Sequence, residues 1–126
     1  MTGKVTGIII VDHGSRRAES NETLLIATRR FADSGLYEIV EPAHMELAPP
    51  DIATAFDRCA DQGALRIIVF PYFLSKGRHW KQDIPQLVAA AAESHPGVEW
   101  NVTAPFGLHD GMLQVIADRI CESLRD

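Results

Sequence analysis

Residues 5–11 read VTGIIIV, a short continuous apolar run that is rich in β-branched residues. A run of this kind is typical of a strand that is buried on both faces, as the strands of a parallel sheet are. An amphipathic helix is expected over residues 18–31, because Leu24, Leu25 and Phe31 recur there at helical spacing. A buried strand followed directly by such a helix is the repeating unit of a parallel α/β fold.

The same alternation continues along the rest of the chain. Further strands are expected over residues 37–40, reaching toward Glu46, and over residues 65–70 and 98–103. A second helix is expected to start at Pro49 and Pro50, with Pro50 or Asp51 in its first turn, and to run to Gln62. Later helices are expected over residues 80–94 and 108–124. The order βαβαβαβα predicts one α/β domain over residues 1–126, with a four-stranded parallel sheet and helices on both faces.

Two prolines bear on the boundaries of these elements. Pro42 lies inside the second strand, which favours an edge strand because proline cannot donate to a sheet ladder. Pro85 lies inside the third helix, where a first-turn position is best tolerated, so a helix start nearer Asp83 is compatible with the pattern. The last helix places five apolar residues on one face: Leu113, Ile116, Ala117, Ile120 and Leu124.

The composition is that of an ordinary globular domain. Of the 126 residues, 46% are hydrophobic and 23% are charged, so a sizeable core can form without disulfides. The formal net charge of −5 disfavours a generic nucleic-acid surface. The apolar runs are far shorter than the ~18–20 residues of a membrane span, so no membrane association is expected.

The two cysteines and the first residues bear on the compartment. Cys59 and Cys121 lie far apart inside apolar helical patterns, without a CxxC motif, and both are expected to be buried thiols in a reducing compartment. Residues 1–4 lack a signal-peptide core and a transit-peptide pattern. A cytoplasmic location is therefore expected, and a mature plastid form would look the same.

Histidines follow two of the expected strands. The segment DHGSRR (residues 12–17) follows the first strand, and PYFLSKGRHW (residues 71–80) follows the third. Because ligands of parallel sheets lie at the carboxyl ends of the strands, His13 and His79 are expected to face one crevice. Two such histidines suit a divalent ion such as Fe, Co, Ni or Zn, while acid–base catalysis and structural roles are alternatives of comparable weight.

The end of the second strand carries a further histidine and a carboxylate. Glu46 and His44 share strand parity, and Glu46 is a candidate to join the two histidines as a metal ligand or proton acceptor. A solvated carboxylate at a strand end is an equally simple interpretation of Glu46. His44 is better interpreted as a hydrogen-bonded structural histidine, because buried polar groups rarely go unpaired.

Basic and aromatic residues flank the two histidines. Solvated loop charges are the plain interpretation of the basic ones, but four cations around one crevice in a chain of charge −5 favour an anionic ligand. A phosphate-binding turn at Gly14-Ser15 is weakly supported, since no longer glycine-rich motif accompanies it. The candidate substrate-binding residues are Ser15, Arg16, Arg17, Phe73, Lys76, Arg78 and Trp80.

Four segments together point to a known family. They are VDHGSRRAESN (11–21), EPAHMELAPP (41–50), FPYFLSKGRHWKQDIP (70–85) and TAPFGLHDGM (103–112). In matching order over about residues 5–124, they resemble the small class II tetrapyrrole chelatases. The chain is most similar to the sirohydrochlorin ferrochelatases of the SirB type, with the CbiX cobaltochelatases next.

The resemblance implies a flavodoxin-like chelatase fold that inserts Fe²⁺ or Co²⁺ into sirohydrochlorin. Both the metal and the tetrapyrrole are then substrates, and no bound cofactor or nucleotide is expected. The family's metal-binding histidines fall on His13 and His79, and its acidic residue falls on Glu46. An iron–sulfur cluster is not expected, because the cysteine-bearing tail of plant relatives is missing, and the basic, aromatic GRHW stretch favours iron over cobalt.

The implied mechanism leaves several rivals. His13 and His79 would hold the metal over the macrocycle or accept the pyrrole protons, with Glu46 assisting. Cobalt or nickel insertion, or a non-catalytic tetrapyrrole or metal carrier, would use the same crevice. A nucleotide-binding or response-regulator module is disfavoured, because Asp12 stands alone. A homodimer is expected, since the larger chelatases are built from two such domains.

Overall fold

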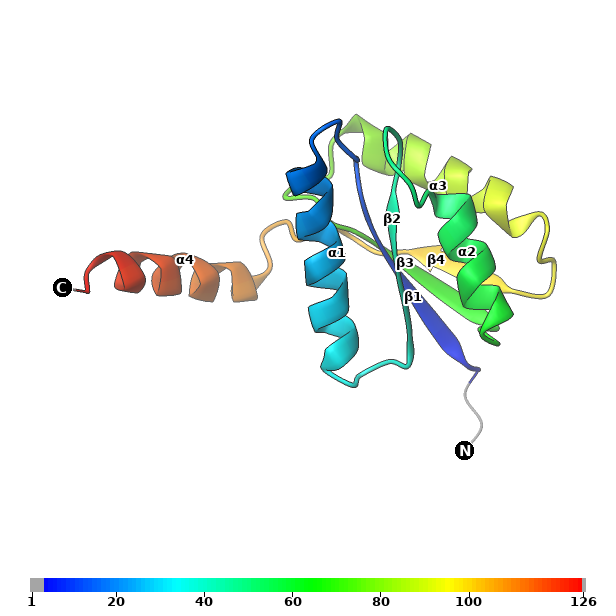
Figure 1. Ribbon diagram of the computed structural model, residues 1–126, viewed down its shortest axis with the longest axis horizontal. Helices are drawn as coiled ribbons and strands as arrows, with labels where there is room; N and C mark the ends of the chain where they lie inside the picture. Colours follow the sequence, from blue (N-terminus) through cyan, green and yellow to red (C-terminus); the bar gives the residue numbers. More distant parts are fainter. Residues whose placement is uncertain (1–3, 126) are drawn as a thin grey trace.

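The computed structural model describes the backbone of residues 4–125 and the side chains of that range except those of residues 78–81. Figure 1 shows a central sheet with helices on both faces. The strands are β1 (Thr6–Asp12), β2 (Ile39–His44), β3 (Arg66–Pro71) and β4 (Glu99–Val102), and the helices are α1 (Ala18–Asp33), α2 (Ile52–Asp61), α3 (Arg78–Ala92) and α4 (Asp110–Ser123). The predicted α/β order is confirmed.

All four strands are parallel and lie in the order β2-β1-β3-β4. From β1 the chain first adds β2 on one side and then crosses to add β3 on the other, so the winding reverses between β1 and β3. Ligands of open parallel sheets bind at such a reversal, outside the carboxyl ends of the strands. The topology therefore predicts a ligand site at the loops that follow β1 and β3.

Strand β1 is buried on both faces because its alternate residues serve two different layers. Ile9 and Val11 belong to the core cluster that α2 and α3 complete. Ile8 and Ile10 pack with Leu24 of α1 on the opposite face. The continuous apolar run of residues 5–11 is thus what a strand between two helical layers requires.

Strand β2 lies at one edge of the sheet, as Pro42 predicted. The strand spans Ile39–His44, so it is longer and ends later than the predicted core of residues 37–40. Pro42 pairs in register with Ile10 of β1. An edge strand tolerates this residue because only one of its two sides takes part in the sheet.

Helix α2 begins at Ile52, and Asp51 precedes it as the N-cap. The helix therefore starts two to three residues later than the predicted start at Pro49 and Pro50. The reason is local: the Asp51 carboxylate accepts a hydrogen bond from the Thr54 N–H at 2.8 Å, which satisfies one of the free amides of the first turn.

Helix α3 begins at Arg78, earlier than the predicted start between residues 80 and 83. Pro85 therefore lies in the helix interior, where it removes one backbone hydrogen bond. Ile84 and Val88 are fully buried on the face that meets the sheet. Packing of this apolar face outweighs the local preference of proline for a first turn.

Helix α4 projects away from the rest of the molecule (Figure 1), and all of its residues are at least partly exposed. Cys121 lies on this helix and is exposed, so the prediction of two buried thiols is wrong for Cys121. Cys59 is buried as predicted, and burial raises the pKa of its thiol to about 12, with a smaller contribution from the charge of Glu41. None of the helices within residues 4–125 combines the length and apolar character that crossing a bilayer requires.

Replacing Asp51 with Ala is expected to lower the free energy of unfolding by about 1 kcal/mol at pH 7, because an N-cap is lost. The hydrogen bond from the Thr54 amide lowers the pKa of Asp51 below its ordinary value of 3.8. The carboxylate's contribution is therefore complete above the unfolded-state pKa and disappears as the pH falls through the lower folded-state pKa. Urea unfolding at neutral and acidic pH measures this difference.

The matched control is Asp61→Ala at the other end of α2. A carboxylate at a helix C-terminus is not stabilised by the backbone amides, so this variant should show no loss of stability. Equal losses for the two variants, or a loss at Asp51 that persists at acidic pH, would contradict the capping role.

Candidate functional site

The ends of β1, β2 and β3 are held together at one edge of the sheet. The Met45 N–H donates to the carbonyl of Asp12 at 2.9 Å, and the Glu46 N–H donates to the carbonyl of His13 at 3.2 Å. On the other side of β1, the Tyr72 N–H donates to the carbonyl of Val11 at 2.7 Å. The backbone therefore places His13 beside Glu46, as predicted for this edge.

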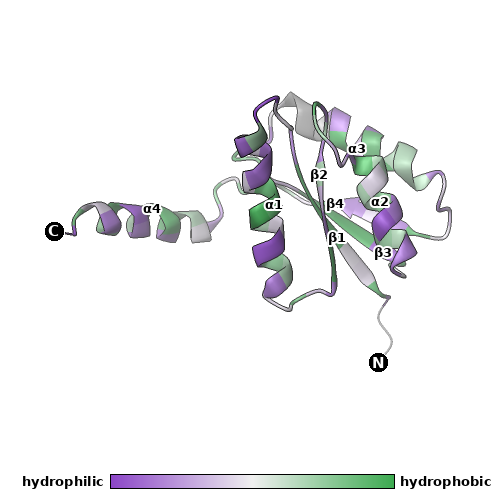
Figure 2. Cartoon of the chain, viewed as in Figure 1, coloured by the Kyte–Doolittle hydropathy of each residue, from purple (hydrophilic) through white to green (hydrophobic). Residues whose placement is uncertain are grey.

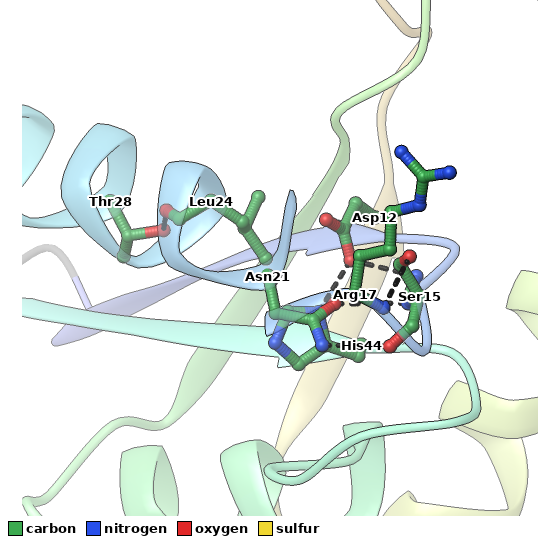
Figure 3. A network of polar contacts seen from close by, with 8 residues as sticks. Asp12, Ser15, Arg17, Asn21, Leu24, Thr28 and His44 are labelled. Atoms are coloured by element: carbon green, nitrogen blue, oxygen red, sulfur yellow. Dashed lines mark hydrogen bonds and ion pairs between the residues drawn. The ribbon is translucent and has the colours of Figure 1, made fainter. Parts of the chain in front are cut away.

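The carboxylate of Asp12 organises this junction (Figure 3). Its Oδ1 accepts the Gly14 N–H at 2.9 Å and lies 2.6 Å from Nδ1 of His44. His44 is fully buried, so its interpretation as a hydrogen-bonded structural histidine is confirmed. Because the Asp12 oxygen accepts, Nδ1 carries the proton, and Nε2 has no hydrogen-bond partner among the described residues.

Gly14 permits a close approach between the segments that follow β1 and β2. Its φ is +86°, in the left-handed region that favours glycine. A Cβ at this position would lie 1.9 Å from the carbonyl oxygen of Glu46 and 3.1 Å from Cβ of His44. A side chain here would therefore separate His13 from the Glu46 segment.

The imidazole of His13 stacks on the ring of Phe73, with ring centroids 4.3 Å apart and planes inclined by 16°. The same imidazole borders two cavities. One, of about 370 Å³, is formed with the loop of residues 72–77, and the other, of about 380 Å³, with the segment after β2 and with α3. Phe73 thus supplies apolar surface beside His13, as predicted.

The second cavity brings two carboxylates beside His13. Glu46 reaches it from the segment after β2, and Asp83 reaches it from α3. Strand parity does not explain the position of Glu46, because β2 ends at His44 and the neighbouring Met45 lines the same cavity. Asp83 was not among the predicted site residues, although it lies four residues, about one helical turn, after His79.

An imidazole beside carboxylates can accept protons or bind a divalent ion. Among the residues whose side chains are described, no group of three His, Cys, Asp or Glu residues is close enough to hold a metal ion. His79 lies in the first turn of α3, within the four residues whose side chains fall outside this description, as do Arg78 and Trp80. The predicted roles of these three residues stay predictions.

Ser15 takes part in the turn that begins α1. Its N–H donates to Oδ1 of Asn21 at 2.9 Å, and Nδ2 of Asn21 donates back to its carbonyl at 2.8 Å. Its Oγ accepts the Arg17 N–H at 3.0 Å. Arg16 and Arg17 are exposed, and Figure 3 shows the Arg17 guanidinium extending away from the His44 ring. The substrate contacts predicted for these three residues stay predictions.

Of the predicted basic residues whose side chains are described, Lys76 is the one that lines a cavity together with His13 and Phe73. It lies on the loop after β3 and is exposed. A cation at this position can attract an anionic ligand toward the histidine.

A parallel sheet whose winding reverses beside a cavity with a histidine and carboxylates defines the class: an open α/β protein with its site at the carboxyl edge. The particular family follows from the sequence, because the model of the CbiX family matches residues 7–123. The chain belongs to the CbiX family.

Three known proteins place the chain among its relatives. It is 53% identical over 118 residues to a protein of Arabidopsis thaliana named sirohydrochlorin ferrochelatase, chloroplastic, covering 94% of this chain and 52% of the relative. A putative cobalamin biosynthesis CbiX protein from Marinobacter aquaeolei superposes with a TM-score of 0.77 at 31% identity, over 94% and 97% of the two chains. The structure described as SirB from Bacillus subtilis with Fe³⁺ superposes with a TM-score of 0.83 at 27% identity, over 96% of this chain and 48% of the other. The chain thus spans about half the length of the plant relative and of SirB.

Replacing Gly14 with Ala is expected to lower the free energy of unfolding by more than about 2 kcal/mol, because both the positive φ and the overlap with the Glu46 carbonyl must be relieved. Gly35→Ala is the matched control, since Gly35 also has a positive φ, of +80°, but nothing lies within 4 Å of its Cβ position. That control should cost about 1 kcal/mol. Urea unfolding of the two variants gives the comparison, and equal losses would rule out a close approach at Gly14.

Proposed function

We propose that this chain is a sirohydrochlorin ferrochelatase, which inserts Fe²⁺ into sirohydrochlorin to make sirohaem. The observation that carries the proposal is the cavity that His13 and Glu46 share at the point where the winding of the sheet reverses. Membership of the CbiX family and 53% identity to the plant ferrochelatase support the choice of reaction and substrate. Both Fe²⁺ and sirohydrochlorin are substrates of this reaction.

Metal insertion is acid–base chemistry coupled to ligand exchange. Two pyrrole N–H bonds break and release two protons while metal–nitrogen bonds form, and the oxidation state of the metal does not change. His13 is proposed to hold the metal or to accept a pyrrole proton, with Glu46 beside it as a second acceptor. His79 is proposed as the second metal-binding histidine. The reaction calls for no resident cofactor, and we propose that the chain has neither one nor an iron–sulfur cluster.

The macrocycle is a polycarboxylate with a flat apolar body. Lys76, which borders the cavity of His13, is proposed to pair with its carboxylates, together with Arg16, Arg17 and Arg78. Phe73 and Trp80 are proposed to contact the apolar body, and Ser15 to supply a polar contact. The ring of Phe73 already stacks on His13, which supports a substrate position close to the proposed metal histidine.

Cobalt insertion in cobalamin synthesis is the second candidate function. It is favoured by the likeness to the Marinobacter protein, whose description names cobalamin biosynthesis. Histidine and carboxylate ligands do not separate Fe²⁺, Co²⁺ and Ni²⁺ by affinity in a way that fixes the physiological metal. Anaerobic assays with each ion, read from the absorbance change of sirohydrochlorin, rank the three metals. A carrier would bind both substrates without accelerating insertion.

We further propose that the chain works as a homodimer, in the cytoplasm or, by analogy with the chloroplastic plant relative, in a plastid. A second subunit would add protein surface around a ligand that is large for one domain. No nucleic-acid partner is proposed, because the net charge is −5.

His13→Ala and His79→Ala are each expected to lower the rate of Fe²⁺ insertion at least about 100-fold, the usual contribution of a positioned acid–base group. His95→Gln is the control, because His95 precedes β4 at the opposite edge of the sheet, where it contacts Asp57 at 2.7 Å. Circular dichroism shows whether each variant is folded. A near wild-type insertion rate for folded His13→Ala would remove His13 from the reaction.

Lys76→Glu is expected to raise KM for sirohydrochlorin about tenfold at low salt, because a cation at the cavity is replaced by an anion. The increase should shrink as salt is added, since screening shortens the range of the charge. Arg58→Glu on α2 makes the same charge change away from the cavity and should leave KM unaltered. A KM for Lys76→Glu that is independent of ionic strength would place Lys76 outside the substrate site.

A further inference from the structure

The last paired residues of β1 and β2 are Asp12 and His44, which lie opposite each other in the register of the two strands. Because opposed residues of neighbouring strands point to the same face, their side chains meet. Nδ1 of His44 donates to Oδ1 of Asp12 at 2.6 Å, so a side-chain hydrogen bond closes the end of the ladder (Figure 3). Directly after this pair the chain continues to His13 on one strand and toward Glu46 on the other.

A histidine at this position lowers the stability of the fold. The sheet around His44 is mainly hydrophobic (Figure 2), and Val40 packs against the core on the same face of β2. His44 is fully buried, and its Nε2 atom has no hydrogen-bond partner among the described residues. A buried polar atom without a partner is unfavourable, and an apolar side chain would avoid it. Residues that break the rules of core packing in this way are expected at functional sites.

His44 also closes the segment that carries Glu46. Its backbone N–H donates to the carbonyl of Pro50 at 2.8 Å, so residues 45–50 form a closed loop. Within this loop Leu47 has a φ of +72°, a left-handed conformation that is uncommon for residues other than glycine. The Leu47 side chain is exposed, so burial does not hold it there. A strained residue persists only where its surroundings fix the backbone, and both hydrogen bonds of His44 contribute to that.

We propose that His44 is a positioning residue, whose hydrogen bond to Asp12 sets the place of the His13 imidazole relative to the Glu46 carboxylate. Without that bond, the strand ends keep two backbone hydrogen bonds, from the Met45 N–H to Asp12 and from the Glu46 N–H to His13. The end of a ladder is where local opening begins. His44 is buried, so it acts through these neighbours rather than on a substrate. The inference rests on the proposed function, in which His13 and Glu46 take part in metal insertion.

Loss of this positioning should lower turnover more than substrate binding. Phe73 and Lys76, two of the proposed contacts of the macrocycle, lie on the loop after β3 rather than on β2. His44→Leu removes the donor and keeps an apolar side chain of substantial size. Its kcat for Fe²⁺ insertion, per folded chain, should fall about tenfold or more, while KM for sirohydrochlorin stays within about twofold, because displaced reacting groups lose rate rather than affinity. Circular dichroism gives the folded fraction.

A conservative variant and a matched control separate positioning from a general loss of structure. His44→Asn should recover kcat to within about threefold of the unaltered chain, because its amide can donate from nearly the position of Nδ1 and has no atom at Nε2. His95→Leu removes the same kind of contact, 2.7 Å to Asp57, at the opposite edge of the sheet and should keep full kcat. Full kcat for folded His44→Leu, or equal losses for the Leu and Asn variants of His44, would overturn the proposal.

Amide hydrogen exchange tests the positioning without the reaction. The Glu46 amide should exchange about tenfold faster in His44→Leu, as the loss of a hydrogen bond to a charged group implies. The Thr103 amide, which donates to β3 at 2.9 Å, should exchange at an unaltered rate.

Asp12→Asn keeps an acceptor but removes its charge, so it should accelerate exchange at Glu46 less than His44→Leu does, and it serves if that variant does not fold. An unaltered exchange rate at Glu46 in the folded variants would overturn the positioning role. A chain that binds both substrates but inserts no metal would instead overturn the proposed function, and exchange at Glu46 would still decide whether His44 holds that segment.

Discussion

One carboxylate, that of Asp12, fixes the geometry on which the candidate site depends. It joins the Gly14 amide to the buried ring of His44 and so ties the end of β1 to the end of β2. Leaving a buried polar group without its partner costs about 1–3 kcal/mol, and the Nε2 atom of His44 already lacks one among the described residues. His13 stands between Asp12 and Gly14, so fixed residues on both sides set the place where its imidazole leaves the sheet.

The order of strands and helices could be predicted because the pattern of apolar residues within each element indicates which of its faces are buried. The run of residues 5–11 is apolar at every parity, as a strand between two helical layers must be. The ends of the elements were harder to predict, because they depend on packing against residues that are distant in the sequence. Proline rules favoured a late start for α3, but the fully buried Ile84 and Val88 hold a helix that already begins at Arg78. Packing outweighed one missing hydrogen bond.

The candidate site, too, could be predicted only in part. Parallel topology was sufficient to place His13 and Glu46 at one edge of the sheet. The reason given for Glu46 was wrong, however, because β2 ends before it, and the Glu46 segment is held by its amide bond to His13 and by the close approach at Gly14. Asp83 could be found only once the start of α3 was known. The contact of Asp12 with His44 spans 32 residues, which no local pattern reports.

Helix α4 shows what a local pattern leaves open. Periodicity predicts that its apolar face, which includes Leu113, Ile116 and Ile120, is buried, but it cannot say against which surface. The turn that sends α4 outward is bonded to the carbonyls of Phe73 and Leu74, in the loop that borders the cavity of His13. The ring of Phe73 stacks on His13 in turn. The direction of α4 and the surroundings of the proposed metal histidine therefore depend on one set of hydrogen bonds, those that join the turn before α4 to the loop after β3.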